Sequence, residues 1–257
     1  MIEITDLHKA FDGREVLKGI TSTFENGKTN LIIGQSGSGK TVLMKCIVGL
    51  FTPTAGDVVY DGRSFVGMTK RERALLRREM GMIFQSAALF DSMSVLENVM
   101  FPLDMFSNDS YKERVRRAQF CLDRVNLSEA GAKFPGEISG GMQKRVAIAR
   151  AIALKPKYLF CDEPNSGLDP KTSLVIDELI HEITQEYNTT TIINTHDMNS
   201  VMGIGEHILY IYEGNREWEG TKDEVMSSDN ERLNNFIFAS DLFRKVKEVE
   251  LEQEGKR

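Results

Sequence analysis

Short apolar runs alternate with amphipathic stretches along most of this chain. Ile2, Ile4 and Leu7 begin an extended segment, which continues over residues 16–24 until Asn26-Gly27 marks a tight turn. Further runs rich in apolar and β-branched residues predict strands at residues 29–33, 58–60, 81–84, 158–161, 190–193, 208–211 and 216–218.

Helical spacing separates many of these runs. Apolar residues recur at three- to four-residue steps after Thr41, over residues 111–125 and over about 140–154. Pro53 ends the first of these helices. The last one must stop before Pro156, because the residue before a proline disfavours the helical conformation.

The order of these elements predicts an α/β fold. Strands that alternate with helices favour a mainly parallel sheet with right-handed crossovers, and the antiparallel turns near both ends add a small N-terminal β layer. We expect one domain over residues 1–257. Its core comprises 1–88 and 158–225, an α-helical subdomain is inserted at 89–157, and a helical extension follows at 226–257.

The composition fits one large domain that has no strong attraction to nucleic acid. The chain has 257 residues, 41% of them hydrophobic, and a formal net charge of −6. Such a protein is repelled by nucleic-acid phosphates unless it carries a local basic patch. Glu72 and Glu79 interrupt the candidate patch, which we interpret as a solvated helix face formed by Arg71, Arg73, Arg77 and Arg78.

The cysteines and the chain start favour a cytosolic protein. Cys46, Cys121 and Cys161 show no CxxC spacing and are odd in number, which predicts reduced, buried thiols. No signal peptide is visible, and no run approaches the ~20 apolar residues of a membrane helix. If the protein works at a membrane, another chain must hold it there.

Residues 34–41 read GQSGSGKT and predict a phosphate-binding loop between a strand and a helix. Its glycines allow several backbone N–H groups to face one anion, and the following helix start adds partial positive charge. Lys40 should reach the β- and γ-phosphates, and the Thr41 hydroxyl should bind Mg²⁺. The residues expected at the nucleotide are Gly34, Ser36, Gly37, Ser38, Gly39, Lys40 and Thr41.

A second motif places two carboxylates after a buried strand. Residues 158–161 are apolar throughout, and Asp162 and Glu163 follow at the carboxyl edge, where α/β sheets bind ligands. We expect Asp162 to hold Mg²⁺ and Glu163 to act as general base toward the attacking water.

Gln85 and His196 also end predicted strands. The Gln85 amide suits the metal or the lytic water, and His196 can hydrogen-bond the γ-phosphate and orient Glu163. Each residue alone would be an ordinary polar loop residue. Between the two phosphate motifs, Ser139-Gly140-Gly141 places small residues at a helix start.

These motifs in this order resemble the ATP-binding subunit of ABC transporters, over about residues 1–225. The matches are Walker A (GQSGSGKT, 34–41), the Q-loop (Gln85), the signature (ISGGMQKR, 138–145), Walker B (YLFCDE, 158–163), the D-loop (Ser166–Asp169) and the H-loop (His196). The resemblance implies an ATPase in which two copies pack head to tail around two ATP molecules.

In that arrangement each ATP lies between the P-loop of one copy and Ser139, Gly140 and Gly141 of the other. Small residues let the helix start approach the γ-phosphate, so ATP holds the dimer together and hydrolysis loosens it. The resemblance also implies that Asp169 communicates across the interface and that Phe11 stacks on adenine. A packing role is the alternative for Phe11.

A narrower resemblance concerns the cargo. The run SAALFDSMSVLENVMFPL at 86–103 and Met142 in the signature resemble the MlaF-like ATPases of MCE lipid-transport systems. That group implies an integral-membrane permease, an MCE-type substrate-binding protein, and movement of phospholipids or related lipids between envelope membranes. Ile138 and Asn165 replace the family's usual Leu and Thr, and Asn165 leaves the geometry of the D-loop open.

The resemblance places the subunit on the cytoplasmic face of the membrane, where residues near Gln85 and the helices of 89–134 should receive a permease helix. Two alternatives stay open: an ABC subunit for another cargo, such as amino acids or lipoproteins, or a soluble ABC ATPase acting on ribosomes or DNA. In the extension, we expect an apolar stripe to brace the dimer, formed by Phe236, Ile237, Phe243 and Val246.

Overall fold

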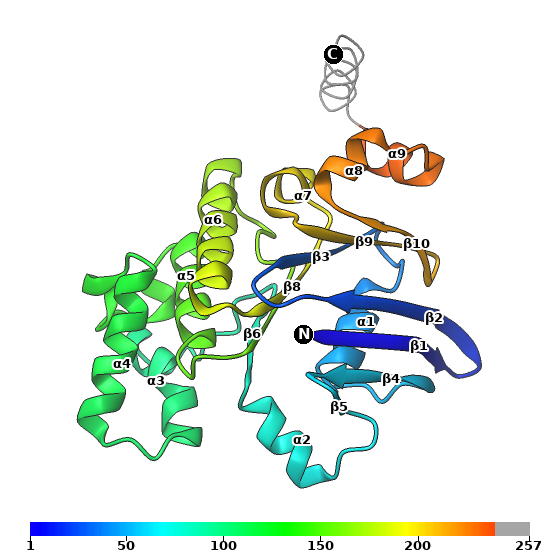
Figure 1. Ribbon diagram of the computed structural model, residues 1–257. Helices are drawn as coiled ribbons and strands as arrows, with labels where there is room; N and C mark the ends of the chain where they lie inside the picture. Colours follow the sequence, from blue (N-terminus) through cyan, green and yellow to red (C-terminus); the bar gives the residue numbers. More distant parts are fainter. Residues whose placement is uncertain (240–257) are drawn as a thin grey trace. The chain divides into compact units, whose positions relative to one another are not determined.

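The computed structural model describes residues 1–239, and its chain divides into two compact units (Figure 1). The first unit contains Met1–Phe24, Thr29–Val66 and the described chain from Asn194 onward. The second contains Glu25–Lys28 and Gly67–Ile193. Strands and helices occur in both units, so the predicted α/β class is confirmed.

The first unit contains the predicted antiparallel β layer. Strand β1 lies between β2 and β4, and the short β5 pairs with β4 (Figure 1). All three pairings are antiparallel. Alternate residues of β1 are buried, including Ile2 and Ile4, because one face of the sheet covers apolar side chains. The bounds are β1 (Ile2–Phe11), β2 (Arg14–Phe24), β4 (Ala55–Tyr60) and β5 (Arg63–Ser64).

The first unit also holds parallel strands. Strand β3 (Thr29–Ile33) is buried at all five positions and pairs in parallel with β9 (His207–Tyr212). Strand β10 (Asn215–Gly220) pairs antiparallel with β9. The helices of this unit are α1 (Lys40–Ile47), α7 (Met198–Ile204), α8 (Lys222–Ser227) and α9 (Glu231–Ile237).

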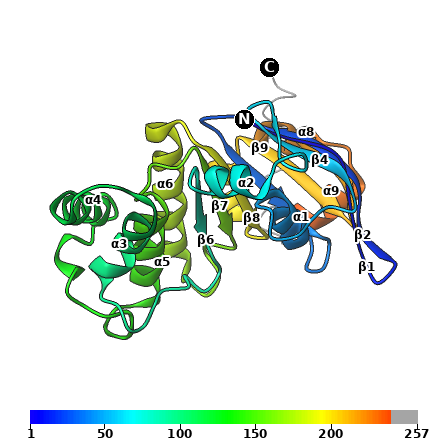
Figure 2. The ribbon, with the colours of Figure 1, turned by 90° about the horizontal axis from the view of Figure 1, so that it is seen from below.

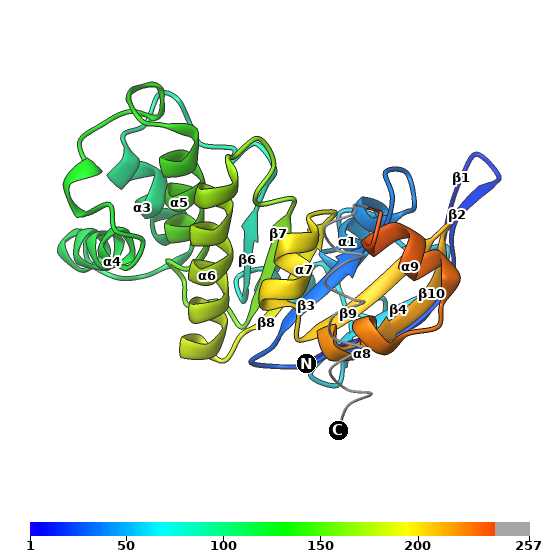
Figure 3. The same cartoon turned by 90° about the horizontal axis from the view of Figure 1, so that it is seen from above.

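Helices α8 and α9 lie beside β9 and β10 (Figure 3). The Phe236 ring stacks on Tyr210 of β9 with 5.3 Å between ring centroids, and Ile237 is buried. These two members of the predicted apolar stripe therefore pack within their own chain. Phe243 and Val246 lie outside the described residues.

The second unit combines parallel strands with a group of helices. Strand β6 (Met80–Ile83) pairs in parallel with β7 (Tyr158–Asp162), and β8 (Thr190–Thr195) begins in this unit and ends in the first. Helices α3, α4 and α5 lie side by side (Figure 2). The helices are α2 (Lys70–Arg77), α3 (Val95–Phe106), α4 (Tyr111–Arg124), η1 (Ser128–Ala130), η2 (Pro135–Glu137), α5 (Gly140–Ala151) and α6 (Pro170–Tyr187).

Local sequence signals explain where these helices start. Thr69, Ser94 and Ser110 form capping boxes at the starts of α2, α3 and α4, each with a glutamate three residues later. At α6, Asp169 is the N-cap and Pro170 occupies the first turn. Each cap satisfies N–H groups that a helix leaves without an internal partner.

Two predicted helix ends are wrong. The helix after the glycine loop ends at Ile47 rather than near Pro53, because Gly49 takes a positive φ of 75° that closes the turn. Helix α5 ends at Ala151 rather than Leu154, and Lys155, at φ 53°, turns the chain ahead of Pro156.

The other sequence features have plain structural outcomes. Cys46, Cys121 and Cys161 are buried free thiols, and burial raises the pKa of the first two to about 11. On α2, Leu76 is buried while Arg71 and Arg77 are exposed. None of the helices in residues 1–239 combines the length and apolar character that crossing a membrane requires.

One carboxylate ties the two sheets of the first unit together. Glu219 of β10 hydrogen-bonds Ser22 Oγ of β2 at 2.6 Å, His207 Nε2 at 2.9 Å and the Arg216 guanidinium at 2.7 Å. Burial alone would raise the pKa of Glu219, but these hydrogen bonds outweigh it and lower the pKa from 4.5 to about 2.

Glu219→Gln should therefore lower the free energy of unfolding by about 2 to 3 kcal/mol near neutral pH. Because the folded-state pKa is depressed, this contribution is fully present above pH 4.5 and is lost as the pH falls toward 2. Urea unfolding of both proteins should show a difference that shrinks as the pH drops below about 5. A difference that stays constant with pH would show that charge is not the cause.

Candidate functional site

The glycine loop lies in the first unit, between buried β3 and α1. Gly34 has φ 152°, and a Cβ built there would lie 2.4 Å from the Ile211 carbonyl oxygen of β9. The Gly214 N–H donates to the Ser38 carbonyl at 3.0 Å, so the turn after β9 braces the loop from the same side. The loop conformation therefore depends on the absence of a side chain at Gly34.

The loop forms a cradle that fits phosphate groups. Helix α1 has Gly39 as its N-cap, at φ 112°, with no side-chain cap on its first N–H groups. The space where Gly37 would carry a Cβ is open, and the buried Ser38 Oγ has no hydrogen-bond partner among the described residues. An uncapped helix start with an unsatisfied hydroxyl beside it suits an anion.

Lys40 supplies the positive charge of this cradle. It is only 7% exposed, and its Nζ donates to the carbonyls of Gly34 at 2.7 Å and Gln35 at 3.1 Å. The ammonium is thus held over the loop itself. Ser36 and Thr41 are exposed at the loop surface, where their hydroxyls can reach a ligand.

Two further predicted residues belong to the first unit. Phe11, at the end of β1, is 38% exposed and packs edge-on against Phe51 at 5.3 Å, with Lys9 Nζ 4.8 Å from its ring centroid. Phe11 therefore packs against its own chain and is also partly exposed. His196 is exposed and directly follows β8, before Asp197 caps α7.

The acidic strand end lies in the second unit. Residues Tyr158 to Cys161 of β7 are fully buried, whereas Asp162 and Glu163 emerge to partial exposure. Glu163 takes a positive φ of 51°, and its carbonyl accepts from the Ser166 N–H at 3.1 Å. The chain therefore turns sharply at the residue that carries the second carboxylate.

Asn165 holds the segment that follows Glu163. Its Nδ2 donates to Asp177 Oδ1 of α6 at 2.8 Å, and both side chains are buried. A charge-assisted bond of this kind is strong in a buried setting. The substitution that left this segment's geometry open thus anchors it to α6.

Asp169 ends the same segment as the N-cap of α6. Its carboxylate accepts from the Thr172 N–H at 3.0 Å and from the Thr172 hydroxyl at 2.5 Å. The Thr172 hydroxyl, followed by its N–H, lowers the pKa of the Asp169 carboxyl. Asp169 itself is exposed, so its outer face remains accessible.

Ser139, Gly140 and Gly141 start α5. Ser139 is the N-cap, with its hydroxyl accepting from the Met142 N–H at 3.3 Å, and Ser139 and Gly140 are exposed. A Cβ at Gly140 would meet open space, whereas one at Gly141 would lie 2.7 Å from Thr172 Cγ2 of α6. The two glycines therefore differ: Gly140 leaves a surface open and Gly141 permits helix packing.

Gln85 follows β6 and is held at both its ends. Its backbone carbonyl accepts a hydrogen bond from Lys144 Nζ of α5, and its side-chain Nε2 donates to Ser166 Oγ at 3.0 Å. Burial lowers the pKa of Lys144, while the charge of the Glu163 carboxylate opposes that shift. Gln85, Lys144, Ser166 and Glu163 thus form one neighbourhood within the second unit.

Comparison with known proteins decides the family. The family model described as "ABC transporter" matches residues 17–166. The chain belongs to the ABC transporter family. As an ABC ATPase, it binds ATP and couples ATP hydrolysis to transport.

Curated relatives of this ABC ATPase carry different cargo names. A methionine import ATP-binding protein, MetN, from Photobacterium profundum is 38% identical over 239 residues, covering 91% of this chain and 69% of the relative. A Mycobacterium tuberculosis protein named "Probable ribonucleotide transport ATP-binding protein mkl" is 33% identical over 236 residues, covering 92% of this chain and 66% of that one.

Solved structures support the fold of the ABC ATPase. The ATP-binding cassette MJ0796, a dimer in a post-hydrolysis state with ADP and Pi, matches with a TM-score of 0.79 and 33% identity over 86% of this chain and 99% of that one. Clostridium perfringens cbiO1, part of the ABC transporter complex cbiONQ, matches with a TM-score of 0.83 and 28% identity over 96% and 97%.

The motifs of the ABC ATPase divide between its units. Phe11, Walker A and His196 belong to the first, whereas Gln85, the signature, Walker B and the D-loop belong to the second. In residues 1–239, no group of three or more His, Cys, Asp or Glu side chains could hold a metal ion. The predicted Mg²⁺ ligands are not a group of that type, since they combine the Asp162 carboxylate with the Thr41 hydroxyl and the Gln85 amide.

Several residues that shape the site were missed by sequence reasoning. They make hydrogen bonds to the backbone or to buried groups of other segments: Asn98, Lys144, Arg150 and Asp177. A cation placed among apolar residues on α5 was the available signal, because a buried charge needs a partner.

Gly34→Ala should destabilise the ABC ATPase more than Gly37→Ala. Both glycines have positive φ, but only Gly34 would bring its Cβ against a backbone oxygen, at 2.4 Å. We expect Gly37→Ala to cost about 1 kcal/mol of stability and Gly34→Ala about 1 to 3 kcal/mol more. Thermal unfolding with and without ATP tests this: the stabilising shift from ATP should vanish in Gly34→Ala. Equal behaviour of the two variants would contradict the proposed constraint.

Proposed function

We propose that this ABC ATPase powers the transport of a phospholipid or related lipid across the bacterial cell envelope, with a permease and an MCE-type substrate-binding protein. The observation that carries the cargo is the run at 86–103, with Met142, which resembles the MlaF-like ATPases. The run is built around the buried Asn98, whose side chain accepts from the Phe90 N–H at 2.8 Å and donates to the Phe90 carbonyl at 3.1 Å.

ATP is bound between two copies of the chain. In one copy, Lys40 and the first turn of α1 hold the phosphates of ATP, and Phe11 stacks on the adenine. The exposed start of α5 in the second copy, Ser139 to Gly141, completes the site from the far side of the γ-phosphate. The open surface at Gly140 supports this role, as does the dimer of MJ0796 with ADP and Pi.

Hydrolysis uses the carboxylate that follows Walker B. Glu163 accepts a proton from the attacking water, whose oxygen then bonds to the γ-phosphorus while the bond to the ADP oxygen breaks. His196 contacts the γ-phosphate and orients Glu163, and Gln85 positions the water. Asp162 and Thr41 would hold Mg²⁺, which would supply positive charge to neutralise the phosphates. Loss of the γ-phosphoryl group removes the anion that α5 contacts, so the dimer loosens.

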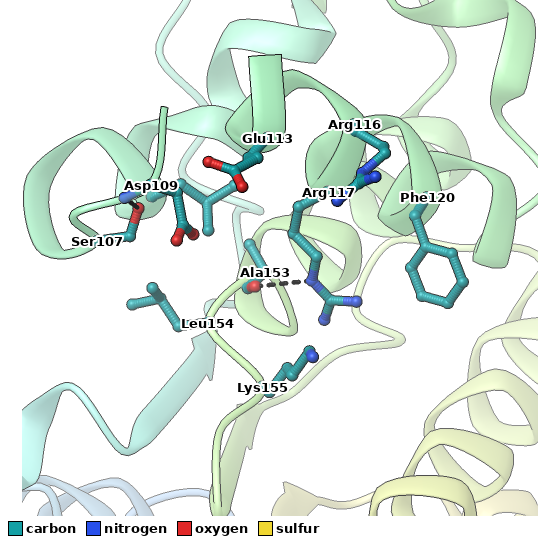
Figure 4. Close-up of a pocket in the computed structure, with 10 residues that line it drawn as sticks. Ser107, Asp109, Glu113, Arg116, Arg117, Phe120, Ala153, Leu154 and Lys155 are labelled. Atoms are coloured by element: carbon teal, nitrogen blue, oxygen red, sulfur yellow. Dashed lines mark hydrogen bonds between the residues drawn. The ribbon is translucent and has the colours of Figure 1, made fainter. Parts of the chain in front are cut away.

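The permease helix binds in a pocket of the second unit, of about 530 Å³ (Figure 4). Arg117 anchors its wall by donating to the carbonyls of Ala153 at 3.0 Å and Ile152 at 2.8 Å, and its guanidinium lies 5.1 Å from the Phe120 ring. Lining residues include Leu103, Ser107, Asp109, Glu113, Arg116, Arg117, Phe120 and Lys155.

The charges of this pocket indicate the chemistry of that helix. Three cations line it, and one of the two acids, Glu113, is engaged in the capping box of α4. The exposed Phe120 offers an apolar contact beside them. A short amphipathic helix that bears a carboxylate and an apolar face fits both features.

Import of a small solute such as methionine is the second candidate function. It is favoured by the identity of 38% to a methionine import ATP-binding protein. The two functions share the same ATPase and differ in the partner: a soluble solute receptor for methionine, an MCE-type protein for lipid.

Glu163→Gln should bind ATP yet hydrolyse it at least ~10²-fold more slowly, because the general base is lost while the amide keeps the side chain's size. The variant should accumulate as an ATP-bound dimer in size-exclusion chromatography. Turnover near the wild-type rate would place the base at another residue.

Ser139→Arg should abolish hydrolysis and spare ATP binding to the single chain, since it obstructs only the contact with the partner's nucleotide. Mixing it with Lys40→Ala chains should restore one working site per dimer, which is about half of the wild-type activity under saturating pairing. Absence of any activity in the mixture would contradict a site shared between two copies.

The cargo is tested by purifying the tagged chain from its native host in detergent and identifying the co-purifying proteins and lipids by mass spectrometry. The lipid proposal predicts a permease, an MCE-type protein and a stoichiometric phospholipid, and ATP hydrolysis stimulated by that lipid in vesicles. Recovery of a solute receptor, with methionine stimulating the ATPase, would replace it. Crosslinks from Arg116→Cys in the same complex should reach the permease.

A further inference from the structure

Buried side chains from α5 hold the loop that follows β6, here called the Gln85 loop (residues 85–90). Lys144 is 5% exposed, and its Nζ donates to the Gln85 carbonyl. Further along α5, the Arg150 guanidinium donates to the Ala87 and Ala88 carbonyls, each at 2.7 Å. Three backbone carbonyls of the loop therefore accept hydrogen bonds from side chains of a single helix.

The Gln85 loop needs this support because its backbone is strained. Ala87 and Ala88 have φ of 61° and 49°, in the left-handed region that residues with a Cβ seldom adopt. This conformation is unfavourable for any residue that carries a Cβ. The other end of the loop is fixed by Asn98 of α3, which bonds Phe90 and the Met93 carbonyl at 3.1 Å. The loop is thus held in one conformation by α5 and α3.

Helix α5 is suited to transmit movement. It starts at the exposed Ser139, and its residues Val146 to Ala149 are fully buried. Lys144 lies five residues from Ser139, which is roughly 7.5 Å along the axis. A displacement of the Ser139 end therefore moves the Lys144 ammonium with it, because the packed helix behaves as a rigid body.

From Gln85 the connection continues to the carboxylate. Gln85 Nε2 donates to Ser166 Oγ at 3.0 Å, and the Ser166 N–H donates to the Glu163 carbonyl at 3.1 Å. Each step joins neighbours within the second unit. The series Lys144, Gln85, Ser166 and Glu163 links the start of α5 to the residue proposed as general base.

We propose that Lys144 is a positioning residue that aligns Gln85 and Glu163 when the start of its own α5 binds the nucleotide of the partner copy. The inference rests on the proposed function of Ser139 to Gly141 in that contact. Lys144 does not touch the nucleotide. Hydrolysis of the ATP held by one chain therefore depends on whether the α5 start of that same chain contacts the ATP held by the partner copy.

Lys144→Met tests this in the full-length chain, since it keeps the apolar stem and removes the ammonium. We expect the ATP dissociation constant to stay within about twofold and kcat to fall about tenfold, as for a group that acts on the reacting geometry rather than on ground-state binding. Lys144→Arg, which retains a buried donor, should recover part of kcat. Lys133→Met is the matched control, because Lys133 is exposed on the same unit, and it should leave both constants unchanged.

A double-mutant cycle separates positioning from general structural damage. If Lys144 acts through Gln85, Lys144→Met should cost about tenfold in the wild-type background and less than about twofold in the Gln85→Ala background. An equal loss in both backgrounds, or a loss of ATP affinity that matches the loss of kcat, would overturn the proposal.

Two further arms keep the test decisive. If Lys144→Met fails to fold, Arg150→Lys, which keeps one donor to Ala87 or Ala88, replaces it in the same cycle with the same expectation. All readouts are ATP binding and hydrolysis, so failure of the lipid assignment leaves them unchanged. Failure of the shared site would appear separately, as lack of complementation between Ser139→Arg and Lys40→Ala.

Discussion

In the proposed function, the molecule depends on the attraction between a phosphate anion and an exposed helix start. Two helices carry such a start, one in each unit. Helix α1 begins after Gly39 without a side-chain cap, and α5 begins at exposed Ser139 and Gly140. Gly39 leaves the first N–H groups of α1 without a side-chain cap. At α5 the Ser139 hydroxyl accepts from the Met142 N–H, and Gly140 leaves the surface beside it open. The remaining architecture holds these two helix starts in place.

The sequence predicted the elements whose signals are local. The strand at 29–33 was placed correctly because three consecutive apolar residues, Leu31 to Ile33, mark it, and all five of its positions are buried. The predicted end of α5 was wrong because the N–H groups of Ala153 and Lys155 bond carbonyls three residues back, so the chain leaves the α-helix well before Pro156. Helix α6 was not specified, although Asp169-Pro170 is a strong start signal.

The candidate site divides in the same way. Motif residues such as Lys40 and Glu163 could be named from the sequence, because their chemistry requires a fixed spacing. Lys144 and Arg150 could not, since each is defined by backbone carbonyls some sixty residues away in the chain. Burying a cation is costly unless hydrogen bonds compensate it, and the carbonyls of the Gln85 loop supply those bonds to Lys144.

Asn165 shows why departures from a family motif must be judged by their contacts. Read as a substitution in the D-loop, it only raised a question about geometry. In the fold it donates to the buried Asp177 of α6, while Asp169 caps that same helix four residues further along the loop. The residue before the D-loop and the last residue of the D-loop are therefore both bonded to α6.

In the proposed function, ATP hydrolysis and cargo selection depend on different surfaces of the chain. Relatives named for methionine and for ribonucleotide transport share 33% to 38% identity with this chain, so conservation of the ATPase cannot decide between cargoes. In the proposed function, selectivity enters through the permease, and the pocket with Arg116, Arg117 and Lys155 is the surface proposed to bind a permease helix. Under that proposal the cargo follows from the permease partner, and residues of α4 and the segment after α5, rather than the catalytic motifs, would choose that partner.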